Sequence, residues 1–346
     1  MKKWYIDAGP DSDVVVSSRV RLARNFKGYP FPRRSTGQQQ ERIIAETCEA
    51  LFIDNPILQK SLELFRFKDI SPIDKQVLVE KHLISKELAD SNLDTAALIS
   101  KDEQISIMIN EEDHLRIQCL ASGMQLEKVF ELCNFLDDTI SEKIDIAYND
   151  KIGYLTSCPT NVGTGIRVSL MLHLPALVMT GYIGPVLESC GKLGVAVRGL
   201  YGENTEAYGN MYQLSNQITL GKSEKDIVMS IQHIGSQVIE QERLLRKELQ
   251  RKNSGKLEDR IMRSYGIMRY CRVLTSEEAL RRLSDIRLGI NLGYINELNE
   301  TDINEMVLNI QPGNLLKEAG KLLKPEDRDI KRAEYVRSRI NKNQSI

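Results

Sequence analysis

The sequence predicts an α+β fold, in which an antiparallel sheet flanked by helices is followed by an all-helical C-terminal domain. Two observations support this prediction. Apolar, β-branched runs of strand length mix with amphipathic helical patterns up to about residue 250, and only helical periodicity follows. The chain has 346 residues, 41% of them hydrophobic, which suits one large domain or two ordinary ones.

The first elements are a strand and a helix. Residues 14–22 read as a strand, whose period of two places Arg19 and Arg21 on one face and apolar side chains on the other. Residues 41–52 repeat their apolar side chains with the spacing of a helix.

The next strand leads into an acidic cluster. Residues 104–109 are apolar and β-branched, which predicts a strand. If the extended geometry continues beyond it, Glu112, His114 and Arg116 share one face. Residues 126–136 then form an amphipathic helix.

A polar segment divides the chain. Residues 169–179 are apolar and buried, with helix or strand left open, and residues 225–249 predict a long helix. The segment 251–256 is polar and contains Gly and Ser, so we place the domain boundary there, giving domains 1–253 and 254–346.

The C-terminal domain is predicted to be helical throughout. Thr275 followed by Glu278 forms a capping box that starts the first helix. A second helix covers residues 303–310 and stops at a Gln-Pro-Gly-Asn run. A third helix covers residues 315–323, and a last one follows Pro325.

Composition excludes several classes of protein. The net charge of −1 gives no reason to expect nucleic acid or an anionic membrane as the main partner. No run of about 18 apolar residues predicts a membrane span, and no apolar signal region follows the N-terminal lysines. The six cysteines are scattered, which predicts reduced thiols in a cytoplasm and argues against a structural zinc site.

Four short stretches far apart in the chain share one chemical theme, arginines that can hold phosphate and carboxylates that can hold a guanidinium. They are SSRVR at 17–21, NEEDHLR at 110–116, CPTNVGTGIR at 158–167 and RGLYGENTE at 198–206. Their order and type indicate transfer of the γ-phosphoryl group of ATP to a guanidine nitrogen.

The arginines are the expected phosphate ligands. A Gly-rich loop ending in Gly-Lys-Ser/Thr is absent from the sequence. Arginine can replace it, because its planar guanidinium meets phosphate oxygens bidentately and keeps its charge. A surface position is the ordinary interpretation of each arginine alone, but five fall in low-charge, Gly-rich or β-rich segments: Arg19, Arg21, Arg116, Arg167 and Arg198.

The acceptor needs carboxylates. A guanidinium has a pKa above about 12 and is a poor nucleophile until a proton leaves. Two carboxylates can grip its edges, align one nitrogen with the phosphorus and accept the proton. Glu112 and Glu203 are the candidates, with the proton acceptor left open. The alternatives are an ordinary acidic turn for Glu112 and a helix-start carboxylate for Glu203.

Cys158 is a third candidate at the acceptor site. Nearby arginines would favour its thiolate. No histidine lies near it in sequence to serve as a base, so we prefer an electrostatic role on the substrate side over nucleophilic attack. The alternative is a buried structural thiol.

The four stretches resemble the phosphagen kinases, creatine and arginine kinase, and more closely the McsB family of bacterial protein arginine kinases. The resemblance covers about residues 14–225, and NEEDHLR is its most specific motif. It implies that Glu112 and Glu203 hold the guanidine, that Cys158 is the reactive cysteine and that His82 contacts adenine. The ATP-site residues that it implies are Ser17, Ser18, Arg19, Val20, Arg21, His82, Arg116, Arg167, Val168, Ser169, Leu170, Met171, Arg198, Gly199, Leu200, Tyr201, Gly202 and Glu203.

The sequence also departs from the kinases of small guanidines. Those enzymes have a helical N-terminal domain that helps to form a substrate lid, whereas the phosphate-binding strand begins here near residue 14. Met108 stands where creatine kinase has a tryptophan, and Gln213 and Thr219 replace charged residues. A site without the lid domain would be open to a large acceptor such as an arginine on a protein surface.

The C-terminal region resembles the protein arginine kinases alone. The run RDIKRA at 328–333 matches their R-D-x-x-R-A motif, which implies that Arg328, Asp329, Arg332 and Ala333 form an allosteric phosphoarginine site. Two arginines one helical turn apart can take the phosphate while the aspartate takes the guanidinium. The alternative is a solvated face of a charged helix.

The resemblance implies a cytoplasmic protein arginine kinase that uses ATP and Mg²⁺, with the metal held mainly through the nucleotide phosphates and no protein metal site. Its product marks proteins for the ClpC–ClpP protease in the stress response. The expected partners are protein substrates with exposed arginines, the CtsR repressor, the McsA activator and a second copy of the chain. The alternatives are a free-arginine kinase and a non-catalytic phosphoarginine-binding adaptor.

Overall fold

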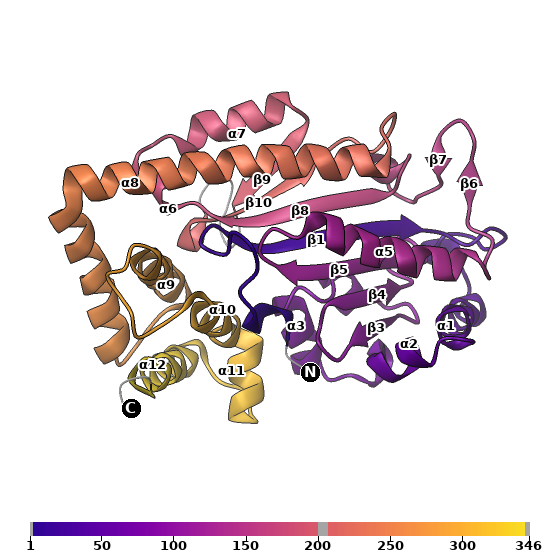
Figure 1. Cartoon of the computed structure of the whole chain (residues 1–346). Helices are drawn as coiled ribbons and strands as arrows, with labels where there is room; N and C mark the ends of the chain where they lie inside the picture. Colours follow the sequence, from indigo (N-terminus) through magenta and orange to yellow (C-terminus); the bar gives the residue numbers. More distant parts are fainter. Residues whose placement is uncertain (1–2, 200–206, 343–346) are drawn as a thin grey trace.

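A computed structural model describes residues 3–199 and 207–342, and its centre is an eight-stranded sheet with antiparallel neighbours throughout (Figure 1). The predicted fold class is confirmed. In spatial order the strands are β2 (Leu62–Arg66), β3 (Ala96–Ser100), β4 (Ile105–Ile109), β5 (Leu115–Ser122), β1 (Val15–Arg24), β8 (Ile166–His173), β10 (Met211–Asn216) and β9 (Val195–Gly199). A two-residue pair, β6 (Tyr148–Asn149) and β7 (Gly153–Tyr154), forms a separate hairpin.

One face of the sheet is apolar and covered by helices. Val20 and Leu22 of β1 and Leu170 of β8 pack into a core with α1 (Gly37–Phe52), α5 (Leu126–Ser141) and the first half of α8 (Glu224–Tyr270). The helices beside this core are α2 (Pro56–Ser61), α6 (Pro175–Met179) and α7 (Ile183–Lys192).

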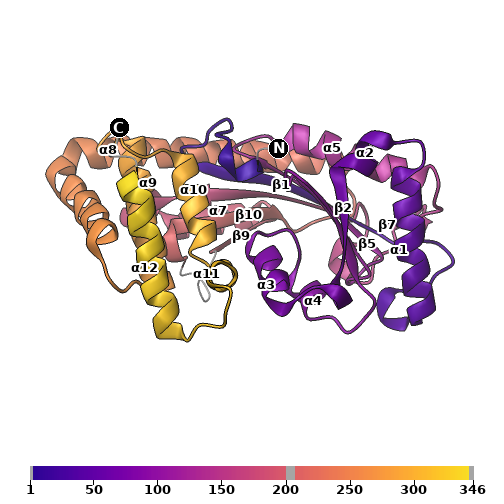
Figure 2. The same cartoon turned by 90° about the horizontal axis from the view of Figure 1, so that it is seen from below.

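The opposite face carries the alternate residues of the same strands, among them Arg19 and Arg21, and we call it the arginine face. Its edge near β3 and β4 is covered by a small apolar cluster that includes Phe67, Leu88 and Met108. That cluster lies with α3 (Pro72–Glu80) and α4 (Lys86–Ala89), which Figure 2 shows from below.

The acidic cluster is a tight turn, so the extended geometry that would have placed Glu112, His114 and Arg116 on one face does not continue beyond β4. Asn110 has a left-handed backbone with φ +60°, and its N–H donates to the carbonyl of His114 at 2.9 Å. The chain therefore reverses between β4 and β5. Glu112 is exposed in the turn and His114 is fully buried, while Arg116 lies on the next strand.

The apolar segment 169–179, left open above, contains both kinds of element. It continues as strand β8 to His173 and becomes helix α6 at Pro175, whose ring suits the first turn of a helix. The carboxylate of buried Glu242 on α8 accepts the N–H groups of Ala176 and Leu177 at 3.0 and 2.9 Å, which caps this short helix.

The predicted boundary segment is helical. Residues 251–256 lie inside α8, which bends where Asn253 leaves helical geometry at φ −137° and ψ 34°. The apolar side chains before the bend pack on the sheet, and those after it, from Leu257 onward, belong to a second core. The division at residue 253 stays a prediction that coincides with this bend.

The C-terminal part is formed by α9 (Ser276–Asn291), α10 (Glu300–Asn309), α11 (Pro312–Ala319) and α12 (Pro325–Lys342), gathered at one end of the sheet (Figures 1 and 2). Thr275 caps α9 as predicted, although Glu278 pairs with Arg282 rather than completing the capping box. The third helix is shorter than predicted, because Gly320 ends it with φ +65° and leaves Leu322 exposed.

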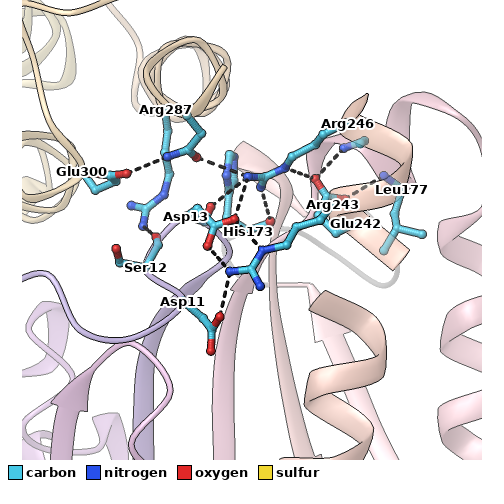
Figure 3. A network of polar contacts seen from close by, with 12 residues as sticks. Asp11, Ser12, Asp13, His173, Leu177, Glu242, Arg243, Arg246, Arg287 and Glu300 are labelled. Atoms are coloured by element: carbon cyan, nitrogen blue, oxygen red, sulfur yellow. Dashed lines mark hydrogen bonds and ion pairs between the residues drawn. The ribbon is translucent and has the colours of Figure 1, made fainter. Parts of the chain in front are cut away.

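A network of buried charges joins the two parts (Figure 3). Arg246 of α8 donates to Glu242 at 2.7 Å and to the carbonyl of Asp13 at 3.1 Å. Arg287 of α9 donates to the carbonyl of Ser12 at 2.8 Å. The short segment before β1 is therefore held by side chains from two helices far along the chain. Within the described ranges, no helix has the length and hydropathy needed to cross a membrane.

Candidate functional site

The arginines predicted to bind phosphate come from neighbouring strands and share the arginine face. Arg21 of β1 lies opposite Arg167 of β8 in the strand register, and Arg19 lies opposite Ser169. The guanidinium of Arg19 donates to Gln213 on β10 at 2.9 Å and to the Ser169 hydroxyl at 3.3 Å. Three adjacent strands thus present their polar side chains to one surface.

These arginines are crowded by like charges. Burial, followed by the nearby charges of Arg116 and Arg167, lowers the pKa of Arg19 to about 10. The pKa of Arg21 is lowered in the same direction by burial and by Arg19, Arg116 and Arg167. The Nε atoms of Arg21 and Arg167 are buried without a hydrogen-bond partner among the described residues. A polyanion such as a triphosphate would satisfy these donors and relieve the repulsion.

Arg116 is oriented by Glu111, a residue for which the sequence analysis proposed no role. One guanidinium nitrogen of Arg116 lies 2.9 and 2.8 Å from the two carboxylate oxygens of Glu111. The Ser85 hydroxyl also donates to Glu111. Because Glu111 is already engaged, it is not available to hold an acceptor.

Asp113 fixes the loop that carries Cys158. One of its carboxylate oxygens accepts the Ser157 N–H and the Asn25 side-chain amide, each at 2.7 Å. The Ser157 hydroxyl donates to the carbonyl of Glu112 at 2.7 Å. The acidic turn and the cysteine loop are therefore bonded together. Asn25 was missed because no local sequence pattern links it to either segment.

Glu112, the first predicted acceptor carboxylate, lies beside Cys158. Partial burial of its carboxyl raises its pKa, and the charges of Asp113 and Glu111 raise it further. The charge of Arg116 and a hydrogen bond with the Cys158 thiol act in the opposite direction. This carboxylate is therefore close to the arginines without being neutralised by one of them.

Cys158 connects the acceptor side with the phosphate side. Its sulfur lies 3.0 Å from the Thr160 hydroxyl and contacts Glu112 as described above. Burial, followed by the charges of Arg198 and Arg116, lowers the pKa of Arg167, and Cys158 is near enough to act in the opposite direction. The predicted set of Glu112, Cys158 and Arg167 is thus brought together by the fold.

The last motif is described only in part. Arg198 is exposed on the edge strand β9, opposite Gln213 of β10, and it lowers the pKa of Arg167. Gly199 pairs with Tyr212 in the same strand. The remaining predicted residues of this motif, Leu200, Tyr201, Gly202 and Glu203, lie outside the described residues, so the role of Glu203 stays a prediction.

Four residues of the predicted ATP segments have side chains on the other face of the sheet. Val20, Val168 and Leu170 are fully buried in the apolar core, and the Ser18 hydroxyl donates to the carbonyl of Gly123 at 2.7 Å. A strand turns alternate residues to opposite faces, so these four side chains point away from the arginine face, and their assignment to the ATP site stays a prediction.

His82 lies at the other end of the arginine face, near Ser17 and Met171. Burial, followed by the charge of Arg19, lowers its pKa to about 4, so the imidazole is neutral at pH 7. Its backbone is left-handed with φ +59°, and its carbonyl accepts the Gln118 amide at 2.8 Å. The predicted adenine contact is therefore a neutral ring beside the predicted nucleotide segments.

The predicted phosphoarginine residues lie on α12. Arg332 and Ala333 are buried, while Arg328 and Asp329 are partly exposed. The guanidinium of Arg332 donates to the carbonyls of Ile310 and Leu274 at 3.0 and 2.8 Å and pairs with Asp329. Arg332 thus anchors α12 to its neighbours, and Arg328 is the more accessible arginine of the motif.

The side chains of the chain also indicate whether the protein itself could coordinate Mg²⁺. The described part of the chain contains no group of three or more His, Cys, Asp or Glu side chains that could hold a metal ion. That Mg²⁺ is held mainly through the phosphates of the nucleotide stays a prediction.

Two family models match consecutive parts of the chain. Residues 43–245 match the ATP:guanido phosphotransferase C-terminal catalytic domain, and residues 254–345 match the protein-arginine kinase McsB C-terminal domain. A protein-arginine kinase of Geobacillus stearothermophilus is 49% identical over 97% of this chain and 93% of its own length. One of Bacillus subtilis (strain 168) is 48% identical over 99% of this chain and 94% of its own length.

Solved structures of guanidino kinases are similar to a large part of this chain. A crystal structure of lombricine kinase, 24% identical, has a TM-score of 0.61 and covers 70% of each chain, which shows the fold. A duplicated taurocyamine kinase from Schistosoma mansoni with bound transition-state analogue components has a TM-score of 0.61 and 26% identity. That match covers 77% of this chain and 38% of the taurocyamine kinase chain.

Proposed function

Because the chain belongs to the ATP:guanido phosphotransferase family, we propose that it is an ATP-dependent protein-arginine kinase. The observation that supports this most directly is the placement of Glu112 and Cys158 beside Arg167 on the arginine face. A carboxylate that can hold a guanidinium is thereby adjacent to arginines that can hold a triphosphate.

The arginines and Glu112 have separate roles in the reaction. Arg19, Arg21 and Arg167 bind the phosphates and neutralise the charge that spreads over the transferred group in the transition state. Glu112 holds the acceptor guanidinium and aligns one nitrogen with the γ-phosphorus. The nitrogen–phosphorus bond forms as the bond to the ADP oxygen breaks, and the proton leaves the nitrogen to a carboxylate. Mg²⁺, when bound with ATP, supplies further charge neutralisation at the phosphates.

Glu112 and Glu203 are the two proposed acceptor carboxylates. Glu112 is the exposed residue of an otherwise buried turn, so a side chain on the surface of another protein can reach it. The curated relatives are named for protein arginine rather than free arginine. Both points favour a protein acceptor.

One assay tests the proposal. The purified chain is incubated with Mg-ATP and either unfolded casein or free arginine, and acid-labile phosphate is measured on each product. We expect phosphorylated casein and little phosphoarginine from the free amino acid. Phosphorylation of free arginine alone would identify a small-guanidine kinase, and no transfer to either acceptor would exclude the proposed activity.

We also propose that Arg328, Asp329, Arg332 and Ala333 on α12 form a phosphoarginine site, with Arg328 as its accessible phosphate ligand. Arg332 is committed to backbone carbonyls, so Arg328→Ala is the cleaner test. One charge-assisted phosphate contact is worth about 1.5–3 kcal/mol, so we expect about 10- to 150-fold weaker binding of phosphoarginine by calorimetry, with ATP binding unchanged. Arg337→Ala on the same helix is the control; equal affinities in the wild type and Arg328→Ala would refute the site.

The family resemblance supports the remaining assignments. We propose that the chain acts in a cytoplasm, uses Mg-ATP, forms a homodimer and marks stress-damaged proteins for ClpC–ClpP. The CtsR repressor and the McsA activator are the proposed partners. Co-purification with each partner, and light scattering of the isolated chain, test these assignments individually.

A further inference from the structure

A narrow cavity of about 50 Å³ lies where the arginine face meets the C-terminal part. Ser17 of β1 and Met171 of β8 line it from the sheet, and His82 lines it from a loop. Trp4 in the N-terminal turn η1 (Trp4–Ile6) and residues of α10 close it from the other side. The sheet, the loop, the N-terminal turn and α10 therefore surround one small space.

The cavity has a fixed relation to the phosphate-binding arginines. Ser17 and Arg21 are four residues apart on β1, and Met171 and Arg167 are four residues apart on β8. At about 3.3 Å per residue, the cavity lies about 13 Å along the sheet from the arginine pair. An extended nucleoside triphosphate with its terminal phosphate at the arginines would place its base at this cavity.

The polar groups around the cavity suit a purine. The indole N–H of Trp4 is buried and has no hydrogen-bond partner among the described residues. The Oδ1 atom of Asn304 on α10 accepts from Arg287 at 2.6 Å, which fixes the side-chain amide and leaves its NH₂ group to donate elsewhere. Ring nitrogens of a base are acceptors that match both donors.

The remaining walls suit the flat faces of a base. Met171 presents a polarisable thioether, and Val307 of α10 presents an apolar surface. The imidazole of His82 is neutral at pH 7, because burial lowers its pKa to about 4, so no charge repels an aromatic ring.

We propose that the C-terminal domain completes the nucleotide-base pocket, so that the base of ATP binds between α10, the N-terminal turn and the sheet. Trp4, Asn304 and Val307 are the residues that this proposal adds to the site. It rests on the proposed kinase function. Bound nucleotide then contacts both the sheet and the C-terminal helices and holds them together. Phosphate binding alone would not do this, because the arginines all lie on the sheet.

The chain itself provides a reporter, because Trp4 is its only tryptophan. The intrinsic fluorescence of the wild-type protein is titrated with ATP, adenosine and inorganic tripolyphosphate. ATP and adenosine should change the Trp4 emission, whereas tripolyphosphate, which occupies only the arginines, should not. An unchanged emission at saturating ATP, in a preparation that phosphorylates casein, would overturn the proposal while leaving the kinase function intact.

A filled pocket provides the second test. Val307→Phe should weaken ATP binding on the order of 30-fold by calorimetry, the loss expected when a stacked base is excluded. Its affinity for tripolyphosphate should equal that of the wild type, which also shows that the variant is folded. Val273→Phe, at an exposed position before α9, is the control. Equal ATP affinity in Val307→Phe and the wild type would refute the base pocket.

Discussion

Arg21 combines a buried position with three positively charged neighbours, Arg19, Arg116 and Arg167. A lysine in its place would meet the same burial and repulsion, which lower the pKa of an amine. Arg21→Lys should therefore lose much of its charge at neutral pH as well as the two-pronged geometry. We expect turnover close to that of Arg21→Ala.

The pH dependence of Arg21→Lys distinguishes charge from geometry. Lowering the pH protonates the lysine, so activity relative to the wild type should rise toward acidic pH if charge is the limiting property. Initial rates of casein phosphorylation across pH 6–9 measure this, with the surface substitution Arg33→Lys as the control. Full activity of Arg21→Lys at every pH would show that Arg21 does not contact the phosphates.

Glu112 should set the acidic limit of activity. It must be ionised to hold a guanidinium, and burial followed by Asp113 and Glu111 raises its pKa. The rate should therefore fall as the pH drops through this raised pKa, at a higher pH than for an ordinary glutamate. Glu112→Gln should lose about 10²–10³-fold in rate, the cost of a lost transition-state contact. Glu142→Gln, on the surface, should retain wild-type rates.

Cys158 should shift the acidic limit of the pH–rate profile through its hydrogen bond to Glu112. The bond lowers the pKa of Glu112, so Cys158→Ala should move the acidic limb of the pH–rate profile to higher pH. Cys158→Ser keeps a donor and should leave the limb in place. If both variants move the limb equally, the thiol does not act on Glu112 through this bond.

At the scale of single residues, strand periodicity was sufficient to place Arg19 and Arg21 on one face. It also implied that Val20 and Val168 face away, although the motif had assigned the whole segments to ATP. The engagement of Glu111 by Arg116 could not be predicted, because it depends on a turn that brings the ends of two strands together.

Among the elements, the turn η5 (Tyr208–Asn210) directly follows the acceptor motif and is seated on α9. The Ser284 hydroxyl on α9 is bonded to the Asn210 amide at 2.7 Å and to His173 at 2.8 Å. Helix α9 thereby holds the turn η5 and the end of strand β8.

Ser284→Ala should measure the strength of this contact. It leaves the Asn210 amide and a buried His173 nitrogen without a partner, which should lower the free energy of unfolding by about 1–3 kcal/mol. Chemical denaturation measures the change, and Ser236→Ala on the exposed side of α8 is the control. A loss no larger than that of the control would mean that solvent replaces both bonds.

The sequence predicted most strands and helices correctly, but it did not predict the conformation of residues 251–256 or the turn at Asn110. Apolar periodicity located most strands and helices, since each has one buried face. The segment 251–256 was interpreted as a boundary from its Gly and Ser, but side chains on both sides of it pack on different cores and keep it within α8. The reversal at Asn110 was missed, because a left-handed asparagine has no distinctive sequence pattern.

For the whole molecule, the buried charges between the two parts should decide whether they unfold together. Arg287 is 1% exposed and donates to the carbonyl of Ser12 and to Asn304. Arg287→Met leaves these two acceptors without a donor, so it should lower the free energy of unfolding by about 1–3 kcal/mol or split the unfolding into two transitions. Calorimetry of this variant beside Arg263→Met, at an exposed position, tests it; one unshifted transition would contradict the expectation.

The anchoring of residues 11–13 has a consequence for synthesis. Their partners Arg243 and Arg287 lie 230 and 275 positions later, so the segment that introduces β1 stays unfastened until most of the chain has left the ribosome. Contacts of such long sequence separation form late in folding. A nascent chain should therefore be unable to phosphorylate anything before its C-terminal third is made, which protects neighbouring polypeptides from an unfinished kinase.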